Sequence, residues 1–328
     1  MQSRLSVNII TFCVLVALGY IIWPKQVPPS PHIPRPVWEI RSIDTMKYSR
    51  DLAREKGNDP LFQELIDAQV SQIASTGATH VGVATPYDVE FIPVLTRWVE
   101  AARRYSLKVW FRGNLSGWEG WFDYPLMSKA AHTSGVVAFI ESNPTLFENG
   151  DYFSSCPECE NGHLGDPRHE WPVADYRQFL INEHRAVNAA FRQVGKNVGT
   201  NLHSMNYDVA TLVMDEATTR ELGGVVAIDH YVKDPLQLAS DVETIAKKSG
   251  GRVFLGEFGA PIPDIHGQMT ADEQAEWVNT ALEDLESSKS LIGVNYWVGV
   301  GGSTAIWNDD SSAKPAVEIL TKYYRKIK

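Results

Sequence analysis

The sequence predicts a single (β/α)8 (TIM) barrel, and three observations lead to this prediction. Short β-rich runs alternate with amphipathic helical patterns along residues 37–328. Eight such runs over about 290 residues match the size and element order of a (β/α)8 barrel. Unusual polar and aromatic residues follow the runs directly, where barrels of this kind carry their chemistry.

Eight runs have the length and composition of buried strands. They are Trp38–Asp44, Thr79–Thr85, Lys108–Asn114, Asp151–Pro157, Asn197–Ser204, Val225–Val232, Arg252–Glu257 and Leu291–Val298. A doubly wound open sheet is the rival fold, and it usually has fewer strands and a glycine-rich turn after the first. Here the first run continues into Thr45-Met46-Lys47-Tyr48, and no change of composition marks a second domain.

Amphipathic patterns predict the helices. In Pro60–Ser75 the apolar residues form one stripe, made of Phe62, Leu65, Ile66, Val70 and Ile73. The same reasoning predicts helices at Val89–Tyr105, Pro172–Val194, Leu236–Ser249, Ala271–Ser288 and Ala316–Lys328. Thr270 and Glu273 have the spacing of a capping box at the start of one of them.

The N-terminal segment differs from the rest of the chain. Residues 7–23 are nearly all apolar and long enough for a marginal bilayer span of about 17–20 residues. No small-residue cleavage site follows, so we expect an uncleaved membrane anchor in residues 1–23 rather than a cleaved signal of a secreted protein. Six prolines in residues 24–36 predict a stiff linker, or else a disordered stretch. The barrel should then lie outside the cytoplasm.

Composition narrows the class of partner. The net charge of −10 argues against a nucleic-acid partner. Ten Trp, 12 Tyr and 12 Phe supply aromatic surface that can stack on sugar rings. A carbohydrate is therefore a better candidate than a polyanion.

Two carboxylates follow strands that should end at the same mouth. Glu257 stands at the tip of Arg252–Glu257 and is followed by Phe258-Gly259, as a barrel glycosidase needs for its nucleophile. Glu158 and Glu160 lie in the loop after the fourth strand. Either of these two could face Glu257 across the mouth. A single glutamate at a strand end is more often a surface or ion-paired residue, so the combination carries the prediction.

Further polar and aromatic residues follow the other strands. The candidates for substrate contact are Arg112, Asn114, Trp118, His203, Asn206, His230, Tyr231 and Trp297. Tyr231 could orient Glu257, and Trp297 could form the floor under a sugar, although core packing explains either residue equally well. Arg112 could steady the charge of Glu257 or pair with Asp44.

These residues resemble those of clan A glycoside hydrolases, the cellulase-like superfamily of retaining barrels, over about residues 38–328. Members carry an acid/base glutamate after strand four and a nucleophile after strand seven, roughly a hundred residues apart. Glu158 and Glu257 are 99 residues apart. The His-x-Tyr-like element after strand six is matched loosely by Asp229-His230-Tyr231, and the Trp after strand eight by Trp297.

The chain departs from this family at one position. Members usually have Asn before the acid/base glutamate, where it binds the sugar 2-hydroxyl, and Pro157 stands here instead. Glu160 therefore remains an alternative to Glu158, and Asn206 or His203 could make the hydroxyl contact. The resemblance implies a retaining hydrolase of an O-glycosidic, β-linked bond in an oligo- or polysaccharide. It needs no cofactor or metal, and its two carboxyls stand ~5–5.5 Å apart.

Two other classes of function stay open. One is a metal-dependent barrel hydrolase with Asp229, His230, Glu257 and His203 as ligands, and the other is a non-catalytic carbohydrate-binding barrel. Cys156 and Cys159, with His163 and His169, have zinc-ligand types but unfamiliar spacing. In an exported domain a disulfide between the two cysteines is the preferred prediction, and two free thiols are the third possibility.

Overall fold

The computed structural model describes residues 37–162 and 165–327. The predicted anchor at 1–23, the linker at 24–36 and His163 lie outside these residues. Across the part that the structure describes, no helix is both long and apolar enough to cross a membrane.

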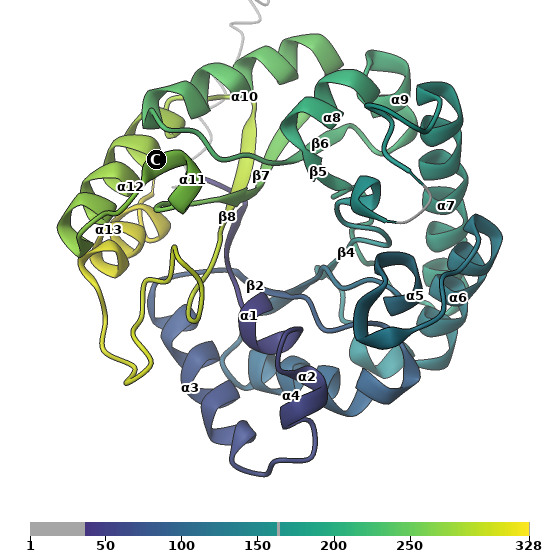
Figure 1. The fold of residues 1–328 in the computed structure, drawn as a ribbon, viewed down its shortest axis with the longest axis horizontal. Helices are drawn as coiled ribbons and strands as arrows, with labels where there is room; N and C mark the ends of the chain where they lie inside the picture. Colours follow the sequence, from purple (N-terminus) through teal and green to yellow (C-terminus); the bar gives the residue numbers. More distant parts are fainter. Residues whose placement is uncertain (1–36, 163–164, 328) are drawn as a thin grey trace, which may run out of the picture. The chain divides into compact units, whose positions relative to one another are not determined.

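Eight parallel strands form the wall of a barrel, and the helices form a ring around it (Figure 1). The strands are β1 Ile40–Asp44, β2 His80–Val83, β3 Lys108–Phe111, β4 Tyr152–Phe153, β5 Ser204–Asn206, β6 Val225–Asp229, β7 Arg252–Phe258 and β8 Leu291–Tyr296. Their order is β4-β3-β2-β1-β8-β7-β6-β5. A parallel bridge between Tyr152 and Gly199 joins the two ends of this order, which confirms the predicted (β/α)8 architecture.

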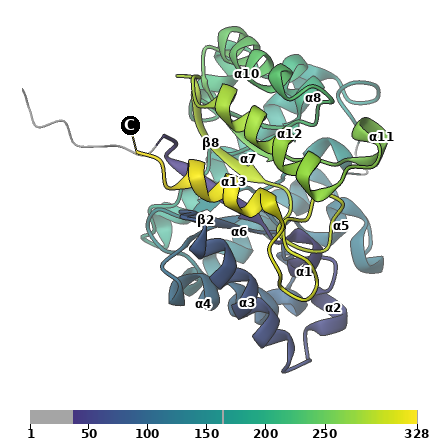
Figure 2. The ribbon, with the colours of Figure 1, turned by 90° about the vertical axis from the view of Figure 1, so that its left-hand side faces the viewer.

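The helices alternate with the strands and cover the outside of the wall. They are α1 Met46–Ser49, α2 Ala53–Lys56, α3 Phe62–Ser75, α4 Ile92–Arg104, α5 Ser116–Glu119, α6 Lys129–Ser142, α7 Val173–Gln193, α8 Tyr207–Val213, α9 Glu216–Glu221, α10 Pro235–Ser249, α11 Pro263–His266, α12 Ala271–Leu285 and α13 Pro315–Tyr324. Figures 1 and 2 both show α13 beside α12 on the outside of the barrel.

The structure corrects several predicted elements. The strand predicted at Asn197–Ser204 is displaced to β5, because the predicted run is mostly polar and forms only an isolated bridge at Gly199. The fourth strand is shortened to two residues, since the chain leaves the wall after Phe153. Helix α6 was not predicted, because Gly135 and the buried His132 interrupt its apolar stripe. The short helices α8 and α9 were also missed.

The inside of the barrel has an apolar layer below a polar one. The lower layer is filled by the buried side chains of Ile40, Trp110, Leu202, Val225, Ala227, Phe254 and Ile292. Within it, Trp110 and Phe254 meet edge to face with ring centroids 5.1 Å apart. Nearer the carboxyl ends of the strands the buried side chains become polar, and this change of chemistry defines the mouth.

The capping box at the start of α12 provides a test of the predicted helix start. The Thr270 hydroxyl accepts a hydrogen bond from the Glu273 amide, and the Glu273 side chain accepts one from the Thr270 amide. We expect Thr270→Ala to lower the free energy of unfolding by about 1 kcal/mol, because amide groups at the helix start lose their partner. Urea titration would measure this change.

Thr280→Ala on the exposed face of the same helix is the matched control and should change stability by less than about 0.5 kcal/mol. Equal losses in both variants would contradict the capping role.

Candidate active site

Arg112, which follows β3, lies at the centre of the polar layer. Its side chain is fully buried above the ring of Trp110, with the guanidinium carbon 4.7 Å from the ring centroid. Nη1 donates to Oδ2 of Asp44, and Nη2 donates to Oε1 of Glu257 at 2.5 Å. One guanidinium thus joins the ends of β1 and β7 from the end of β3. The pair with Asp44 predicted from the sequence is present together with a contact to Glu257, and the effect of Arg112 on the charge of Glu257 stays a prediction.

The side chain of Asp44 accepts hydrogen bonds from several donors. Besides Arg112, its Oδ1 accepts from the Met46 amide at 2.6 Å, and its Oδ2 accepts from Nδ2 of Asn295 at 3.2 Å. Gly82 leaves room for this group, since a Cβ atom there would lie 3.0 Å from Oδ2 of Asp44.

Glu257 lies at the base of the mouth and is only 6% exposed. Arg112 donates to one of its oxygens, and the Tyr231 hydroxyl donates to the other at 2.7 Å. Both donors stabilise a negative charge on this carboxylate and fix its direction. The hydrogen bond from Tyr231 to Glu257 therefore supports the orienting role expected for Tyr231.

A bulge in β7 determines where Glu257 stands. Ile228 of β6 pairs with Leu255, but the next residue, Asp229, pairs with Glu257, so Gly256 is passed over. Such a bulge re-aims the side chains that follow it. Only glycine fits here, because a Cβ atom on residue 256 would lie 2.5 Å from Oδ1 of Asp229.

Glu158 approaches the same point from the loop after β4. It is partly exposed, its amide donates to the Ser204 carbonyl of β5 at 2.7 Å, and its backbone is left-handed with φ 46° and ψ 45°. Burial, together with the nearby charges of Glu257 and Glu160, raises the pKa of Glu158 to about 8. At neutral pH this carboxyl group therefore carries its proton.

Three carboxyl groups converge at the mouth. One oxygen from each of Glu158, Asp229 and Glu257 lies within 4.8 Å of the other two. Two of these residues come from β6 and β7, and the third comes from the loop that follows β4. Side chains from distant parts of the sequence therefore face one another across a single space.

Asp229 is the most deeply buried of the three groups. Its Oδ2 accepts from the Ser204 hydroxyl and lies 3.7 Å from Nη2 of Arg112. Among the described residues its Oδ1 has no hydrogen-bond partner. Burial and the charge of Glu257 raise the pKa of Asp229 well above its usual range. Arg112 brings one positive charge to three carboxyl groups, so the protonated form of Asp229 is favoured.

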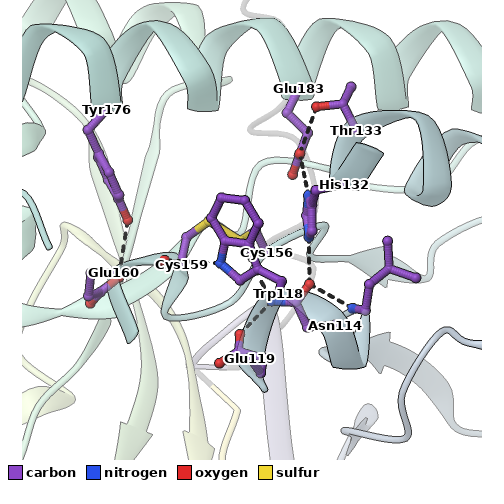
Figure 3. The surroundings of a disulfide bond; sticks show 11 residues. Asn114, Trp118, Glu119, His132, Thr133, Cys156, Cys159, Glu160, Tyr176 and Glu183 are labelled. Atoms are coloured by element: carbon purple, nitrogen blue, oxygen red, sulfur yellow. Dashed lines mark hydrogen bonds and ion pairs between the residues drawn. A yellow bond between two sulfur atoms is a disulfide. The ribbon is translucent and has the colours of Figure 1, made fainter. Parts of the chain in front are cut away.

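Glu160 is directed away from this convergence. One of its oxygens accepts from the amide of Asn206 at 2.7 Å and from Nδ2 of Asn206 at 3.0 Å. The other accepts from the Tyr176 hydroxyl at 3.2 Å (Figure 3). Burial raises the pKa of Glu160. These contacts fasten the loop after β4 to β5 and α7, and they occupy Asn206.

Three residues predicted to contact substrate are not accessible to one, and these predictions are wrong. Trp118 is fully buried and stacks on Phe179, with ring centroids 5.2 Å apart. Asn114 is fully buried beside His132. His203 points outward to His184, and its burial lowers the pKa of His203 to about 3.

The remaining two predicted residues differ in their direction. His230 stacks on Tyr207 and its Nε2 lies 2.7 Å from Oδ2 of Asp241, so its polar edge faces α10. Trp297 is partly exposed and meets Tyr231 edge to face, with ring centroids 6.0 Å apart. Trp297 therefore lies beside the residue that bonds Glu257, whereas His230 does not.

Sequence reasoning missed two supports of the site. Ser204 bonds Asp229 through its side chain and Glu158 through its carbonyl, whereas the sequence placed Ser204 at the end of the predicted strand and not at the start of β5. Asn295 donates to Asp44 and to the Gly256 carbonyl, the latter at 2.8 Å. Its place near the end of a predicted strand was visible, but its partners were not.

The cysteine pair and the proposed metal ligands have clear outcomes. Cys156 and Cys159 form the predicted disulfide, so their sulfurs are not thiolate ligands for zinc. His203 and His230 bond His184 and Asp241 and do not join Asp229 and Glu257, so that ligand set is wrong. The three converging carboxyls have the spacing to hold a cation, but the Arg112 guanidinium already bonds Glu257 there.

Replacing Asp229 should change how the free energy of unfolding depends on pH, because the pKa of Asp229 is raised in the folded state. A raised pKa means that the folded state binds the proton more tightly than the unfolded chain, so this group makes the wild type less stable as pH rises above about 4. We expect the stability of Asp229→Asn relative to wild type to increase with pH from that point, by at most about 1.4 kcal/mol per pH unit. Urea titrations from pH 4 to 8 would measure it.

The control for this experiment is Val242→Ala, which truncates a buried side chain of α10 but removes no titrating group. Its stability difference from wild type should stay constant across the same pH range. A difference for Asp229→Asn that shrinks as pH rises would show that Asp229 is folded as a carboxylate.

Comparisons with known proteins identify the fold. No protein-family model and no curated protein matches the sequence. Among solved structures, GH5_18 from Streptomyces cattleya in complex with GlcNAc matches with a TM-score of 0.66 and 17% identity, over 89% of this chain and 80% of that one. A GH5_18 variant from Bifidobacterium longum subsp. longum in complex with Manβ1-4GlcNAc matches with a TM-score of 0.65 and 14% identity, over 87% and 78%.

A third matching structure is a glycosidase that is not described as GH5_18. β-Glucuronidase 2 from Bacteroides uniformis, covalently bound to cyclophellitol-6-carboxylate aziridine, matches with a TM-score of 0.60 and 10% identity, over 88% of this chain and 35% of that one. The sequence identities are low, so the likeness concerns the fold. This chain has the (β/α)8 barrel fold found in these glycosidases.

Proposed function

We propose that this protein is a retaining glycoside hydrolase that cleaves an O-glycosidic bond, with Glu257 as the nucleophile and Glu158 as the general acid and base. The observation that carries the proposal is the approach of their carboxyl oxygens to within 4.8 Å in one mouth. Retaining enzymes hold these groups about 5–5.5 Å apart, whereas inverting enzymes need about 6.5–9.5 Å to admit a water molecule.

The environments of the two groups suit opposite roles. Glu257 accepts hydrogen bonds from a guanidinium and a phenol, which direct its oxygens and suit the role of a nucleophile. Glu158 retains its proton at neutral pH, because its pKa is raised to about 8. A proton held on one of two neighbouring carboxyl groups is what divides the acid from the nucleophile.

The reaction then follows in two steps. Glu257 forms a bond to the anomeric carbon while the bond to the leaving oxygen breaks and Glu158 gives that oxygen its proton. Water next attacks the anomeric carbon, Glu158 takes a proton from that water, and the bond to Glu257 breaks. The raised pKa of Asp229 favours its neutral form, which places no further negative charge beside Glu257.

The substrate class is proposed from the site and from the compared structures. Trp297 is partly exposed beside Tyr231, and an aromatic face in this position suits the apolar side of a sugar ring. Two of the compared glycosidases are bound to GlcNAc or Manβ1-4GlcNAc. We therefore propose a β-linked oligo- or polysaccharide as the substrate.

The cellular location is proposed from the chain itself. The apolar run at residues 7–23 supports a membrane anchor in residues 1–23, with the barrel outside the cytoplasm. A disulfide in the loop after β4 fits an oxidising compartment.

Substitution of the three loop and strand glutamates tests the assignment. The experiment is a panel of aryl and oligosaccharide β-glycosides, including Manβ1-4GlcNAc, glucosides and glucuronides, with the soluble barrel from residue 37. We expect Glu257→Gln and Glu158→Gln to lower kcat/KM for the oligosaccharide β-glycosides by at least about 100-fold, because each variant loses a group that acts in the transition state. Glu160→Gln is the matched control and should keep most of the activity.

Several outcomes would overturn the assignment. Full activity in Glu158→Gln together with loss in Glu160→Gln would transfer the acid role to Glu160. Sugar binding without turnover in the wild type would favour a carbohydrate-binding barrel. Activity that disappears with a chelator and returns with a metal ion would favour a metal-dependent hydrolase.

The pH dependence offers an independent test. Because Glu158 must be protonated to act as an acid, kcat/KM should fall as pH rises through about 8. The charge of Glu257 contributes to this raised pKa, so Glu257→Gln should lower the pKa of Glu158. Carbon-13 NMR of labelled glutamate side chains would follow the titration directly. An unchanged titration in the variant would mean that the two groups do not interact.

A further inference from the structure

The loop after β4 places the proposed acid inside a covalent ring. Cys156 and Cys159 are joined by a disulfide, and Glu158 is one of the two residues between them. A cross-link over so short a loop restricts the unfolded chain little, so its contribution to the stability of the whole barrel is small. The bond therefore calls for another explanation.

The backbone of Glu158 supplies that explanation. The backbone of Glu158 is left-handed, a conformation that residues other than glycine and asparagine rarely adopt. Its amide and carbonyl are bonded to Ser204 and Asn161, but its carboxyl group makes no hydrogen bond within the described residues. The position of the carboxyl group therefore depends on the backbone, and the disulfide and Pro157 restrict that backbone.

The disulfide is in turn fixed to the core (Figure 3). Both cysteines are 2% exposed. Nδ2 of Asn114 lies 3.7 Å from the sulfur of Cys156, and Nε1 of Trp118 donates to the Cys159 carbonyl at 3.2 Å. Gly162 completes the fit, since a Cβ atom there would lie 2.2 Å from Nε1 of Trp118.

A buried chain of polar groups extends this support to α6 and α7. Nε2 of His132 lies 2.7 Å from Oδ1 of Asn114, and its Nδ1 lies 2.7 Å from Oε2 of Glu183 (Figure 3). These residues are buried, and the proposed reaction does not use them. Their contacts run from α7 through α6 to the sulfur of Cys156, so two outer helices brace the ring that carries Glu158.

We propose that the Cys156–Cys159 disulfide is a positioning element of the reaction, which holds the carboxyl group of Glu158 at the leaving oxygen. This inference rests on the proposed glycosidase function. Without the bond, Glu158 can relax to a right-handed backbone, and its carboxyl group then swings away from Glu257. The bond should therefore affect proton donation much more than sugar binding or attack by Glu257.

Leaving-group dependence separates these effects. The variant is Cys156→Ala/Cys159→Val, whose apolar side chains suit buried positions, and Cys156→Ser/Cys159→Ser is the second version if the first fails to fold. The probes are the methyl and 2,4-dinitrophenyl β-glycosides of the sugar that the panel selects. We expect kcat/KM for the methyl glycoside to fall by about 100-fold and that for the dinitrophenyl glycoside by less than about threefold, because the latter leaving group needs no proton.

A matched control removes the effect of general destabilisation. Leu238→Ala truncates a buried residue of α10, far along the sequence from this loop, and should lower Tm without changing the ratio of the two activities. In the cysteine variant the loss of activity near pH 8 should also flatten for the methyl glycoside. Equal losses for both glycosides, or no loss for either, would overturn the positioning role. An inactive wild type would instead overturn the proposed function.

Discussion

The buried guanidinium of Arg112 is the interaction on which the mouth of the barrel depends. A charge enclosed in this way is tolerated only with close partners, and Asp44 and Glu257 are those partners. The three residues come from β1, β7 and the end of β3, so the same contacts that neutralise the charge also fix the spacing of strands around the mouth. The apolar layer beneath them, with Trp110 directly under the guanidinium, keeps water from reducing these attractions.

Arg112 also decides how protons are distributed over the neighbouring acids. Its single positive charge faces two carboxyl groups, Asp44 and Glu257, so a further negative charge nearby is disfavoured unless it reaches solvent. Burial favours the neutral form of Asp229, whereas Glu158 is partly exposed and can exchange its proton. Burial and nearby charges together set how readily each group loses its proton. Chemically identical groups within 4.8 Å can therefore hold different roles.

Much of this arrangement was predictable from the sequence, and the reasons for the failures are physical. Glu257 stood out because a buried apolar run led directly to it, and the capping box at Thr270 depends only on local spacing. Asn114, Trp118 and His203 were misjudged because neighbouring residues around a strand end face opposite sides, and sequence does not say which side is the mouth. Helix α6 was invisible because part of its buried face is polar, and its partner Glu183 lies 51 residues beyond His132. The hydrogen bond between Ser204 and Asp229 could not be predicted, because it depends on the pairing between β5 and β6.

The shortness of β4 has an effect on the working molecule. Between β4 and β5 the wall is joined by one bridge at Tyr152 and Gly199 and by a few backbone hydrogen bonds around it, whereas β7 shares extended pairing with both β6 and β8. Local opening of a structure costs the least free energy where the fewest backbone hydrogen bonds must break. This sparsely bonded part of the wall lies next to the loop that carries Glu158, so local opening there would displace Glu158 while β7, which carries Glu257, stays paired with β6 and β8.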